Sequence, residues 1–377
     1  MAKKFNKFFP YFAIIFTIAI STFFIWFPFL FKISNWLGIS IPNSNFQYIL
    51  KNYDGPLYIV AAKSLYNPLL INNLNLELSL SAKYFAAHLP LYPLLIKFLA
   101  PFFGFLKSMI VVNIFFTVIL SLFFYFLLKN LHLSQKPLLL TIIFLFLPRF
   151  LVIRSIGAPE SLFIFLILLS LYFFEKQKYF LAGIAGGLAT VTKTPGILLF
   201  AGYFLTIIEK YLKERKINWH WFNIVFIPIG LMLVFLWYEK QYGNFLAYFN
   251  QEGFVPLVFP YSVFNFQKQW VGTAWLEEIV LYFLLYLLTV ISLKNIKYRS
   301  FFYFSLVFFI ATTFIQHRDI SRYSLPLWPL TCFIFADFFT SKKFLLAFII
   351  ILPAIYLFAW NYLTFNILPI SNWKPFL

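Results

Sequence analysis

Long runs of apolar residues alternate along the chain with short polar loops that hold most of its lysines and arginines. A transmembrane helix needs about 20 apolar residues, and the runs lack the two-residue alternation of outer-membrane strands. The pattern therefore predicts an all-α polytopic membrane protein that crosses the bilayer about eleven times. The predicted spans are residues 9–31, 107–128, 137–153, 160–174, 179–193, 196–209, 222–239, 274–293, 300–316, 323–339 and 343–361.

Basic residues set the expected sidedness of these spans. Lys and Arg concentrate in cytoplasmic loops, so we place every basic cluster between the spans on the cytoplasmic side of a plasma membrane. The N-terminus is then cytoplasmic, and the first apolar run is too long for the hydrophobic region of a signal peptide. The clusters are Lys3/Lys4/Lys7, Lys129/Lys136, Lys176/Lys178, Lys210/Lys213/Arg215/Lys216, Lys294/Lys297/Arg299 and Lys342/Lys343.

Two longer polar stretches are predicted on the extracytoplasmic side. The first outer loop, residues 32–106, is expected to hold about two or three surface helices, and the second covers residues 240–273. The apolar segment 89–104 lies within the first loop and contains prolines and Lys97. We expect this segment to form an amphipathic or re-entrant helix on the outer surface, where a long lysine side chain can reach water.

Composition agrees with a membrane protein and narrows its partners. Hydrophobic residues make up 62% and charged residues only 11% of the 377 residues, which a soluble core cannot accommodate. The net charge of +18 is spread over short clusters between spans, so we expect membrane lipids as partners and no nucleic acid. The single Cys332 and the scattered histidines offer no metal site, and no nucleotide-binding motif is present. No cofactor is expected, and a divalent metal has no support in the sequence.

The acidic residues of the outer side are the candidates for a general base. Asp54 lies in the first outer loop, directly before Gly55-Pro56. Its carboxylate could cap a surface helix from Gly55 to Tyr66, could act in chemistry, or could do both. The acids that this topology places outside or at the outer boundary are Asp54, Glu77, Glu160, Glu239, Glu252, Glu277, Glu278 and Asp319.

Charged residues also stand at the ends of predicted spans. Glu160 opens a span, where the helix dipole alone favours an acid. Arg149 lies inside an apolar run and Arg154 follows it, and ionisable residues at such depth usually pair or face a cavity. We therefore expect either a local ion cluster of these three residues or arginines that face an anion.

A second group of cations is predicted at the same outer face. Lys193 precedes Thr194-Pro195-Gly196 at a break between two apolar helices, and a cation beside free backbone donors attracts phosphate. Extension of the lysine toward water would explain its position equally well. Arg318 and Arg322 flank Asp319 in a short outer turn, where an ion pair at the surface is the simpler interpretation.

Five short motifs, taken in order, give the chain a family likeness. They are Tyr53-Asp54-Gly55-x-x-Tyr58, Leu89-Pro90-Leu91-Tyr92-Pro93 through Lys97, Ala158-Pro159-Glu160-Ser161, Leu181-Ala182-Gly183 through Thr192-Lys193-Thr194-Pro195-Gly196, and Arg322-Tyr323-x-x-Pro326. In this order they resemble the GT-C superfamily of polyprenyl-phosphate-sugar-dependent glycosyltransferases. The likeness is to the protein O-mannosyltransferase and aminoarabinose transferase type and to the mannosyltransferases of GPI-anchor synthesis. Gly55 departs from the first of these, which usually has a second acid after Asp.

The resemblance implies a fold, a reaction and a set of site residues. It predicts a GT-C-like bundle with residues 1–210 as the catalytic module and residues 211–377 as a variable module. Asp54 would accept the proton of an acceptor hydroxyl, and the sugar, most often mannose in such enzymes, would be transferred with inversion at the extracytoplasmic face. Lys193 and Arg322, with Arg154 or Lys97 as further candidates, would stabilise the leaving lipid phosphate. Glu160 and Tyr58 complete the expected substrate-binding set. The acceptor, a glycolipid, glycan or protein, is left open.

Two other classes of function fit parts of the pattern. In a multi-span transporter or lipid flippase, Arg149, Glu160 and Lys193 would line a pathway, and Asp54 would only cap a helix. Internal repeats would favour that class, and none is visible in the sequence. An envelope polysaccharide ligase or polymerase would suit the large second outer loop, but it would not explain the acid of the first loop.

Overall fold

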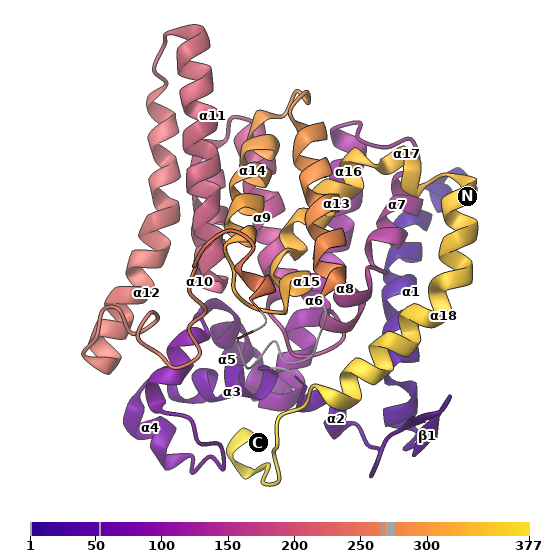
Figure 1. Cartoon of the computed structure of the whole chain (residues 1–377), viewed down its shortest axis with the longest axis vertical. Helices are drawn as coiled ribbons and strands as arrows, with labels where there is room; N and C mark the ends of the chain where they lie inside the picture. The colour runs from indigo at the N-terminus through magenta and orange to yellow at the C-terminus, as the bar shows by residue number, and fades with distance from the viewer. Residues whose placement is uncertain (1, 53, 266, 268–275) are drawn as a thin grey trace. The chain divides into compact units, whose positions relative to one another are not determined.

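The computed structural model describes residues 2–52, 54–265, 267 and 276–377, and the chain is mostly helical (Figure 1). Contacts divide it into two compact units. Unit 1 comprises Met1–Phe165 and Ala336–Leu377, and unit 2 comprises Leu166–Phe335. The prediction of a helical chain is thus confirmed. The division into a catalytic module up to residue 210 and a variable module after it stays a prediction.

Within the described residues, five helical segments are long and apolar enough to cross a membrane. Shorter apolar helices occupy several of the other predicted spans. The membrane class predicted from the sequence agrees with these helices, whereas the count of eleven spans stays a prediction. The five segments are Phe8–Leu30, Phe105–Asn130, Thr194–Glu214, Trp219–Tyr242 and Lys342–Phe365.

Unit 1 is built from both ends of the chain. Its long helices are α1 (Ala2–Leu30), α6 (Phe105–Asn130) and α18 (Lys342–Phe365). Trp360 of α18 donates a hydrogen bond from Nε1 to the Ile25 carbonyl of α1 at 3.1 Å, which ties two distant parts of the sequence together. The other elements are β1 (Asn35–Trp36), β2 (Ile39–Ser40), α2 (Gln47–Leu50), α3 (Gly55–Ser64), α4 (Pro68–Asn73), η1 (Ala82–Ala87), α5 (Leu91–Phe103), α7 (Pro137–Phe144), α8 (Pro148–Ile153), the start of α9 (Glu160–Glu175), α17 (Ala336–Phe339) and η6 (Lys374–Phe376).

The first outer loop is more structured than the sequence indicated. Strands β1 and β2 form an antiparallel hairpin in which Asn35 pairs with Ser40 and Trp36 with Ile39. Its turn residues Leu37 and Gly38 have φ of 52° and 84°. Positive φ at both turn positions matches the right-handed twist of a tight hairpin, and glycine accepts it without strain. Leucine is unusual at the first position of such a turn, so the turn is difficult to predict from the sequence.

Two helices of this loop correspond to predicted surface helices. Helix α5 occupies most of segment 89–104 and has one buried side, with Tyr92, Pro93 and Ile96, and one exposed side. Helix α3 covers residues 55–64 of the predicted 55–66, and nearly all its residues are buried. It ends at Leu65, whose φ of 50° terminates the helix in the left-handed region.

Proline breaks some of the predicted spans. The span expected at residues 137–153 consists of two short helices, α7 and α8, separated before Pro148. A proline lacks the N–H that would continue the helix, and its ring disfavours helical geometry at the preceding residue. The span expected at 323–339 is likewise divided into short helices around Pro326 and Pro329.

Unit 2 contains a close helix pair, α10 (Tyr179–Thr192) and α12 (Phe226–Tyr242). A Cβ atom added at Gly187 would lie 2.7 Å from the Phe226 carbonyl oxygen, and one at Gly230 would lie 2.7 Å from the Gly187 oxygen. The backbones therefore approach as closely as small residues allow. The remaining elements are η2 (Thr194–Ile197), α11 (Leu198–Glu214), η3 (Trp219–Val225), η4 (Ser262–Phe264), α13 (Glu277–Leu293), α14 (Arg299–Thr313), α15 (Ile320–Tyr323), η5 (Leu325–Leu327) and α16 (Trp328–Ile334).

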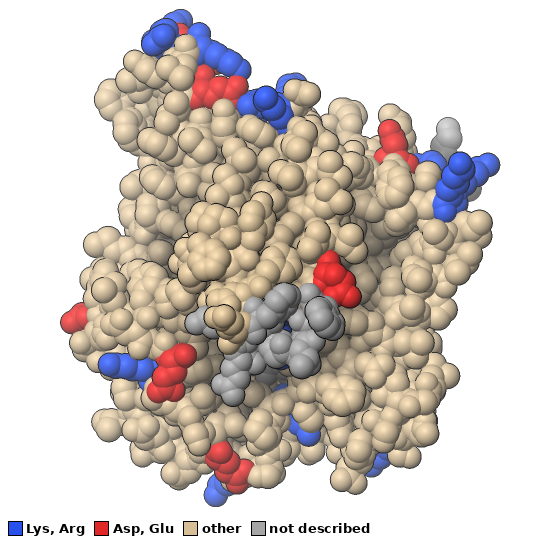
Figure 2. All heavy atoms as spheres, viewed as in Figure 1, with Lys and Arg blue, Asp and Glu red and all other residues tan. Residues whose placement is uncertain are grey.

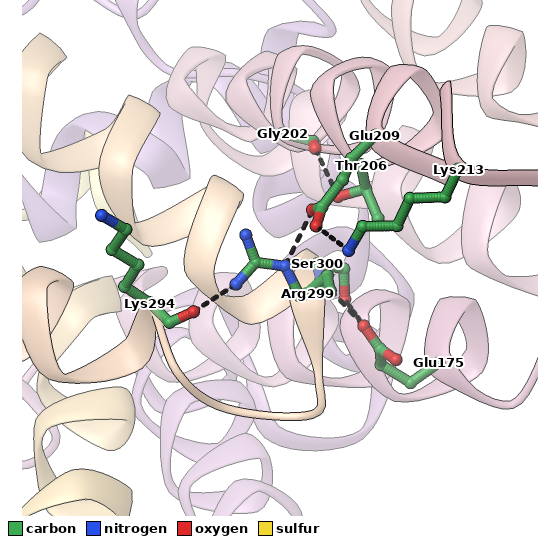
Figure 3. A network of polar contacts seen from close by, with 8 residues as sticks. All are labelled: Glu175, Gly202, Thr206, Glu209, Lys213, Lys294, Arg299 and Ser300. Atoms are coloured by element: carbon green, nitrogen blue, oxygen red, sulfur yellow. Dashed lines mark hydrogen bonds and ion pairs between the residues drawn. The ribbon is translucent and has the colours of Figure 1, made fainter. Parts of the chain in front are cut away.

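A polar network joins three helix ends of unit 2 (Figure 3). Arg299 donates from Nε to Glu209 at 2.8 Å, and Lys213 donates to the other oxygen of that carboxylate at 2.6 Å. Ser300 donates to Glu175 through both its N–H, at 2.8 Å, and its hydroxyl, at 2.6 Å. These hydrogen bonds therefore hold the start of α14 against the end of α9 and the end of α11.

Basic residues gather at this end of unit 2. Exposed Lys213, Arg215 and Lys216 lie at the end of α11, where Figure 2 shows a cluster of blue side chains above a largely uncharged face. The loops that the sequence assigned to one side of the membrane, near residues 175, 213 and 299, thus meet within this unit.

Candidate functional site

Asp54 stands at the start of α3 in unit 1. Its backbone oxygen accepts hydrogen bonds from the N–H groups of Leu57 at 2.9 Å and Tyr58 at 3.2 Å, so it occupies the N-cap position. Its side chain makes no capping hydrogen bond, and its backbone does not have the extended conformation usual for a cap. The expected capping by the carboxylate is therefore not formed. Tyr53, which precedes Asp54 in the motif, lies outside the described residues.

Gly55 fixes the start of α3 against two other segments. A Cβ atom at this position would lie 2.9 Å from Sδ of Met109 on α6 and 3.1 Å from the backbone oxygen of Gly157. Both distances are shorter than ordinary carbon contacts, so a larger residue would displace Met109 and crowd the loop before α9. Glycine is therefore the residue that fits after Asp54 without a shift of its neighbours.

Tyr58 belongs to an aromatic cluster one turn further along α3. Its ring lies edge-on to His88, with ring centroids 4.7 Å apart, and edge-on to Tyr92, with centroids 5.0 Å apart. Tyr92 donates its hydroxyl to the Met109 carbonyl at 2.7 Å. The first motif and the Pro-Leu-Tyr-Pro motif are therefore packed against each other, and edge-to-face rings of this kind hold a defined geometry.

Glu160 is only 2% exposed and belongs to the same part of unit 1. Burial raises the pKa of Tyr92 well above its usual range, and the nearby Glu160 carboxylate raises it further. A backbone hydrogen bond at Ala158 lowers this pKa, but by less. The backbone hydrogen bond at Ala158 and the closeness of Gly55 to Gly157 place the third motif beside the first two. Three segments thus meet near Tyr92: the start of α3 with Asp54 and Tyr58, α5 with Tyr92 itself, and the start of α9 with Glu160.

Arg154 makes its hydrogen bonds with α1 and with the end of α7. It is completely buried, and its guanidinium donates to the hydroxyls of Ser21 at 2.6 Å and Thr22 at 3.0 Å and to the Leu145 carbonyl at 3.2 Å. These acceptors are neutral and lie on α1 and just after α7. Arg149 lies over the ring of Tyr362 on α18, at 4.2 Å from the ring centroid. Both arginines therefore connect α8 with neighbouring helices of unit 1.

Lys97 lies on the same helix as Tyr92. It is half-buried on α5, next to Phe98, which is 71% exposed. Among the described residues it has no hydrogen bond or ion pair. The structure therefore places it beside an exposed aromatic side chain.

The second group of candidates meets in unit 2. Lys193 is extended, with φ of −149° and ψ of 135°, and separates α10 from η2. Its ammonium group lies 6.0 Å from the ring centroid of Tyr323, at the limit of a cation–π contact. Arg322, the neighbour of Tyr323, is 7% exposed. Residues separated by more than a hundred positions in the sequence, Lys193 and the Arg-Tyr motif, are thereby brought together.

Two further residues of this group were not foreseen. The Tyr248 hydroxyl forms a 2.7 Å hydrogen bond with the hydroxyl of Thr194, directly after Lys193. His317 packs its ring edge-on to Tyr323 at 5.4 Å and accepts a 3.1 Å hydrogen bond from the Asp319 N–H through Nδ1. Neither belongs to a recognisable motif, and only the abundance of polar and aromatic residues in the second outer loop pointed to Tyr248. Part of that loop, residues 266 and 268–273, lies outside the described residues.

The site residues thus divide between the units: Asp54, Tyr58, Glu160, Arg154 and Lys97 belong to unit 1, and Lys193 and Arg322 to unit 2. Among the residues that the structure describes, no group of three or more His, Cys, Asp or Glu side chains could hold a metal ion. Comparison of the chain with protein-family models, with curated proteins and with solved structures finds no match.

Proposed function

We propose that this protein is an inverting glycosyltransferase of the plasma membrane. It transfers a sugar from a polyprenyl-phosphate donor to an acceptor hydroxyl at the extracytoplasmic face. Mannose is the first sugar to assay, because it is the commonest one in the family that the sequence resembles.

One observation carries the proposal. Three motifs that are far apart in the sequence meet in unit 1, where Gly55 packs beside Met109 and Gly157, and Tyr58 packs on Tyr92. The remaining two motifs meet in unit 2 through Lys193 and Tyr323. A helix cap would give no reason for the first grouping and scattered surface cations would give none for the second, whereas functional roles for these residues would explain each.

The proposed reaction is a single displacement. The acceptor oxygen forms a bond to the anomeric carbon while the bond from that carbon to the phosphate oxygen breaks. Asp54 takes the proton of the acceptor hydroxyl, and the polyprenyl phosphate leaves with the electron pair of the broken bond. Attack and departure occur on opposite faces of the sugar, so its configuration inverts.

Lys193 and Arg322 are the proposed partners of the phosphate. Negative charge grows on the phosphate oxygens as the bond breaks, and fixed cations stabilise that charge most in the transition state. Lys193 has an extended backbone at the break after α10, and its ammonium group lies near the ring of Tyr323. The next residue, Thr194, is hydrogen-bonded to Tyr248. Arg154 is a weaker candidate for this role, because its guanidinium donates hydrogen bonds to α1 and to the Leu145 carbonyl.

A panel of donors tests the proposed class. Membranes that contain the protein are supplied with polyprenyl-phosphate monosaccharides, with polyprenyl-diphosphate oligosaccharides and with the free lipids, and the glycosylated products and lipid movement are measured. We expect transfer from one monosaccharide phosphate donor and none from membranes that lack the protein. Transfer only from a diphosphate-linked oligosaccharide would indicate a polymerase or ligase. Lipid movement without any transfer would indicate a transporter, and either result would refute the proposal.

A further inference from the structure

The segment after α18 runs back along the first outer loop. Figure 1 shows this segment, residues 366–377, passing from the end of α18 beneath α3 and toward α4. Ile367 forms an antiparallel bridge with Asn52, and the Leu368 N–H donates to the Lys51 carbonyl at 2.9 Å. We call residues 366–377 the C-terminal strap. Its first contact lies only two residues before Asp54 in the sequence.

Asn52 anchors this contact at the end of α18. Its side chain is completely buried and donates from Nδ2 to the Leu363 carbonyl at 2.9 Å. The last carbonyls of a helix have no partner within the helix, so an outside donor satisfies a group that would otherwise be buried without a hydrogen bond. Asn52 therefore fixes the chain before Asp54 to a long helix from the other end of the sequence.

Lys63 anchors the other end of α3. Its ammonium group donates to the backbone oxygens of Pro375 at 2.9 Å and Leu377 at 2.8 Å, and it also lies 5.1 Å from the Phe105 ring centroid. Pro375 and Phe376 are buried against this unit. Farther along the first loop, Glu77 accepts hydrogen bonds from the Ser371 hydroxyl and, at 3.3 Å, from the Asn372 N–H.

The strap thus holds the short helix that begins at Asp54 from both ends. Helix α3 has only ten residues, and isolated helices of that length are marginal in water. Its position depends on contacts with other segments, which include α4, α5, α6, η1 and the strap. Catalysis by a general base requires the carboxylate to be held in place, since a displacement of about 1 Å can cost about a hundredfold in rate.

We propose that Asn52, through its hydrogen bond to the end of α18, and Lys63, through its hydrogen bonds to the strap, are positioning residues that hold Asp54 in its reactive place. This inference rests on the proposed function, because it assigns the strap to the same reaction. The strap itself takes no part in the chemistry. It acts through the ends of α3.

Single substitutions give the first test. We expect Asn52→Ala and Lys63→Met each to lower the turnover number by about tenfold while apparent donor affinity changes little, because the phosphate site is elsewhere. The matched controls are Asn361→Ala, whose amide donates to the Leu357 carbonyl within α18, and Lys83→Met, an exposed lysine of η1. Turnover in Asn52→Ala and Lys63→Met equal to that of their controls would overturn the proposal.

A reversible cross-link separates positioning from general stability. In a Cys332→Ala background, Asn52→Cys removes the tether, and adding Ile367→Cys lets oxidation restore it, because bridged partners have Cα atoms about 4.5–5.5 Å apart. We expect low turnover in the reduced double variant and recovery to within about twofold of the Cys332→Ala parent after oxidation. Formation of the disulfide without recovery would refute the positioning role. Failure to form the disulfide would refute the contact itself.

A readout without sugar transfer keeps the two proposals separate. If the Cys332→Ala parent transfers no sugar, the proposed function fails. The role of the strap is then tested by the rate at which a thiol reagent alkylates the Asp54→Cys variant. We then expect Asn52→Ala to raise the alkylation rate about tenfold and Asn361→Ala to leave it unchanged, because loss of the tether frees the start of α3. Equal rates in the two variants would overturn the positioning role.

Discussion

Lys193 shows how a single residue gains a defined setting from its backbone. It lies where α10 stops, its backbone is extended, and Tyr323 limits the position of its ammonium group. A lysine that only extends toward water would need none of these constraints. The proposed phosphate site therefore predicts specific effects for Lys193 and for the neighbour of Tyr323, Arg322.

Removal of either cation should reduce donor use more than folding. We expect Lys193→Ala and Arg322→Ala each to lower the rate of transfer by about 10²- to 10³-fold, as the loss of one fixed donor to a developing charge does elsewhere. Initial rates at several donor concentrations, normalised to the amount of folded protein in the membrane, measure this. Lys178→Ala, an exposed lysine in a basic loop, is the control and should keep full activity. Rates like that of the control in both variants would remove the two cations from the site.

For single residues, the sequence indicated which side chains matter better than it indicated their contacts. Asp54 was correctly expected at a helix start, because Asp before Gly-Pro is a common N-terminal pattern, yet the capping hydrogen bond is not formed. For Arg154 the sequence left open an ion cluster or contact with an anion, and it gave no sign of the hydrogen bonds to Ser21 and Thr22. Those hydroxyls lie more than a hundred residues away, so no local pattern could have indicated them.

Among the elements, apolar length predicted helices well and proline determined where they break. Helices α1, α6 and α18 follow the predicted spans closely, because each is a single long apolar run. The division between α7 and α8 follows from Pro148, whose effect on the preceding residue is local. The hairpin of β1 and β2 was missed, since Leu37 and Gly38 carry only a weak turn signal.

The close approach of α10 and α12 gives a prediction at the same scale. Gly187→Leu would drive a side chain into the Phe226 carbonyl, and overpacking of this kind costs about 1–3 kcal/mol. We expect a clear loss of resistance to thermal unfolding in detergent, measured by the fraction of protein that remains monodisperse after heating. Leu188→Phe enlarges an exposed position on the same helix and should have little effect. Equal stability of the two variants would show that the helices do not pack through Gly187.

For the whole molecule, the feature that the sequence did not indicate is the return of the chain to its start. Contacts join residues 336–377 to unit 1. Links such as Leu368 to Lys51 and Trp360 to Ile25 create this arrangement. They are single hydrogen bonds between distant residues, which hydrophobic periodicity does not encode.

Two helices of unit 2 predict which side of the membrane the proposed phosphate site faces. Helices α10 and α14 have 14 and 15 residues, about 21 and 23 Å of helix, and both begin at basic loops. Lys193 follows the end of α10 and Tyr323 follows α14, so their contact lies at the helix ends opposite those loops. This agrees with a proposed phosphate site on the extracytoplasmic side.

Cysteine labelling of intact cells measures this sidedness. In a Cys332→Ala background, we expect a membrane-impermeant maleimide to label Lys83→Cys, an exposed position of the first outer loop, without lysis. Lys178→Cys, exposed in a basic loop, should be labelled only after lysis, because Lys and Arg are retained on the cytoplasmic side. The reverse pattern would place Asp54 in the cytosol and contradict the topology.

The most direct test of the account is sugar transfer by Asp54→Asn. The amide keeps the size of the carboxylate and cannot accept the proton, so we expect the rate to fall by about 10²- to 10⁴-fold while insertion and abundance stay normal. Asp54→Glu serves as the matched variant that retains a base, and it should keep measurable activity. Near-normal transfer by Asp54→Asn, in membranes where the wild type is active, would contradict the central claim that Asp54 is the base.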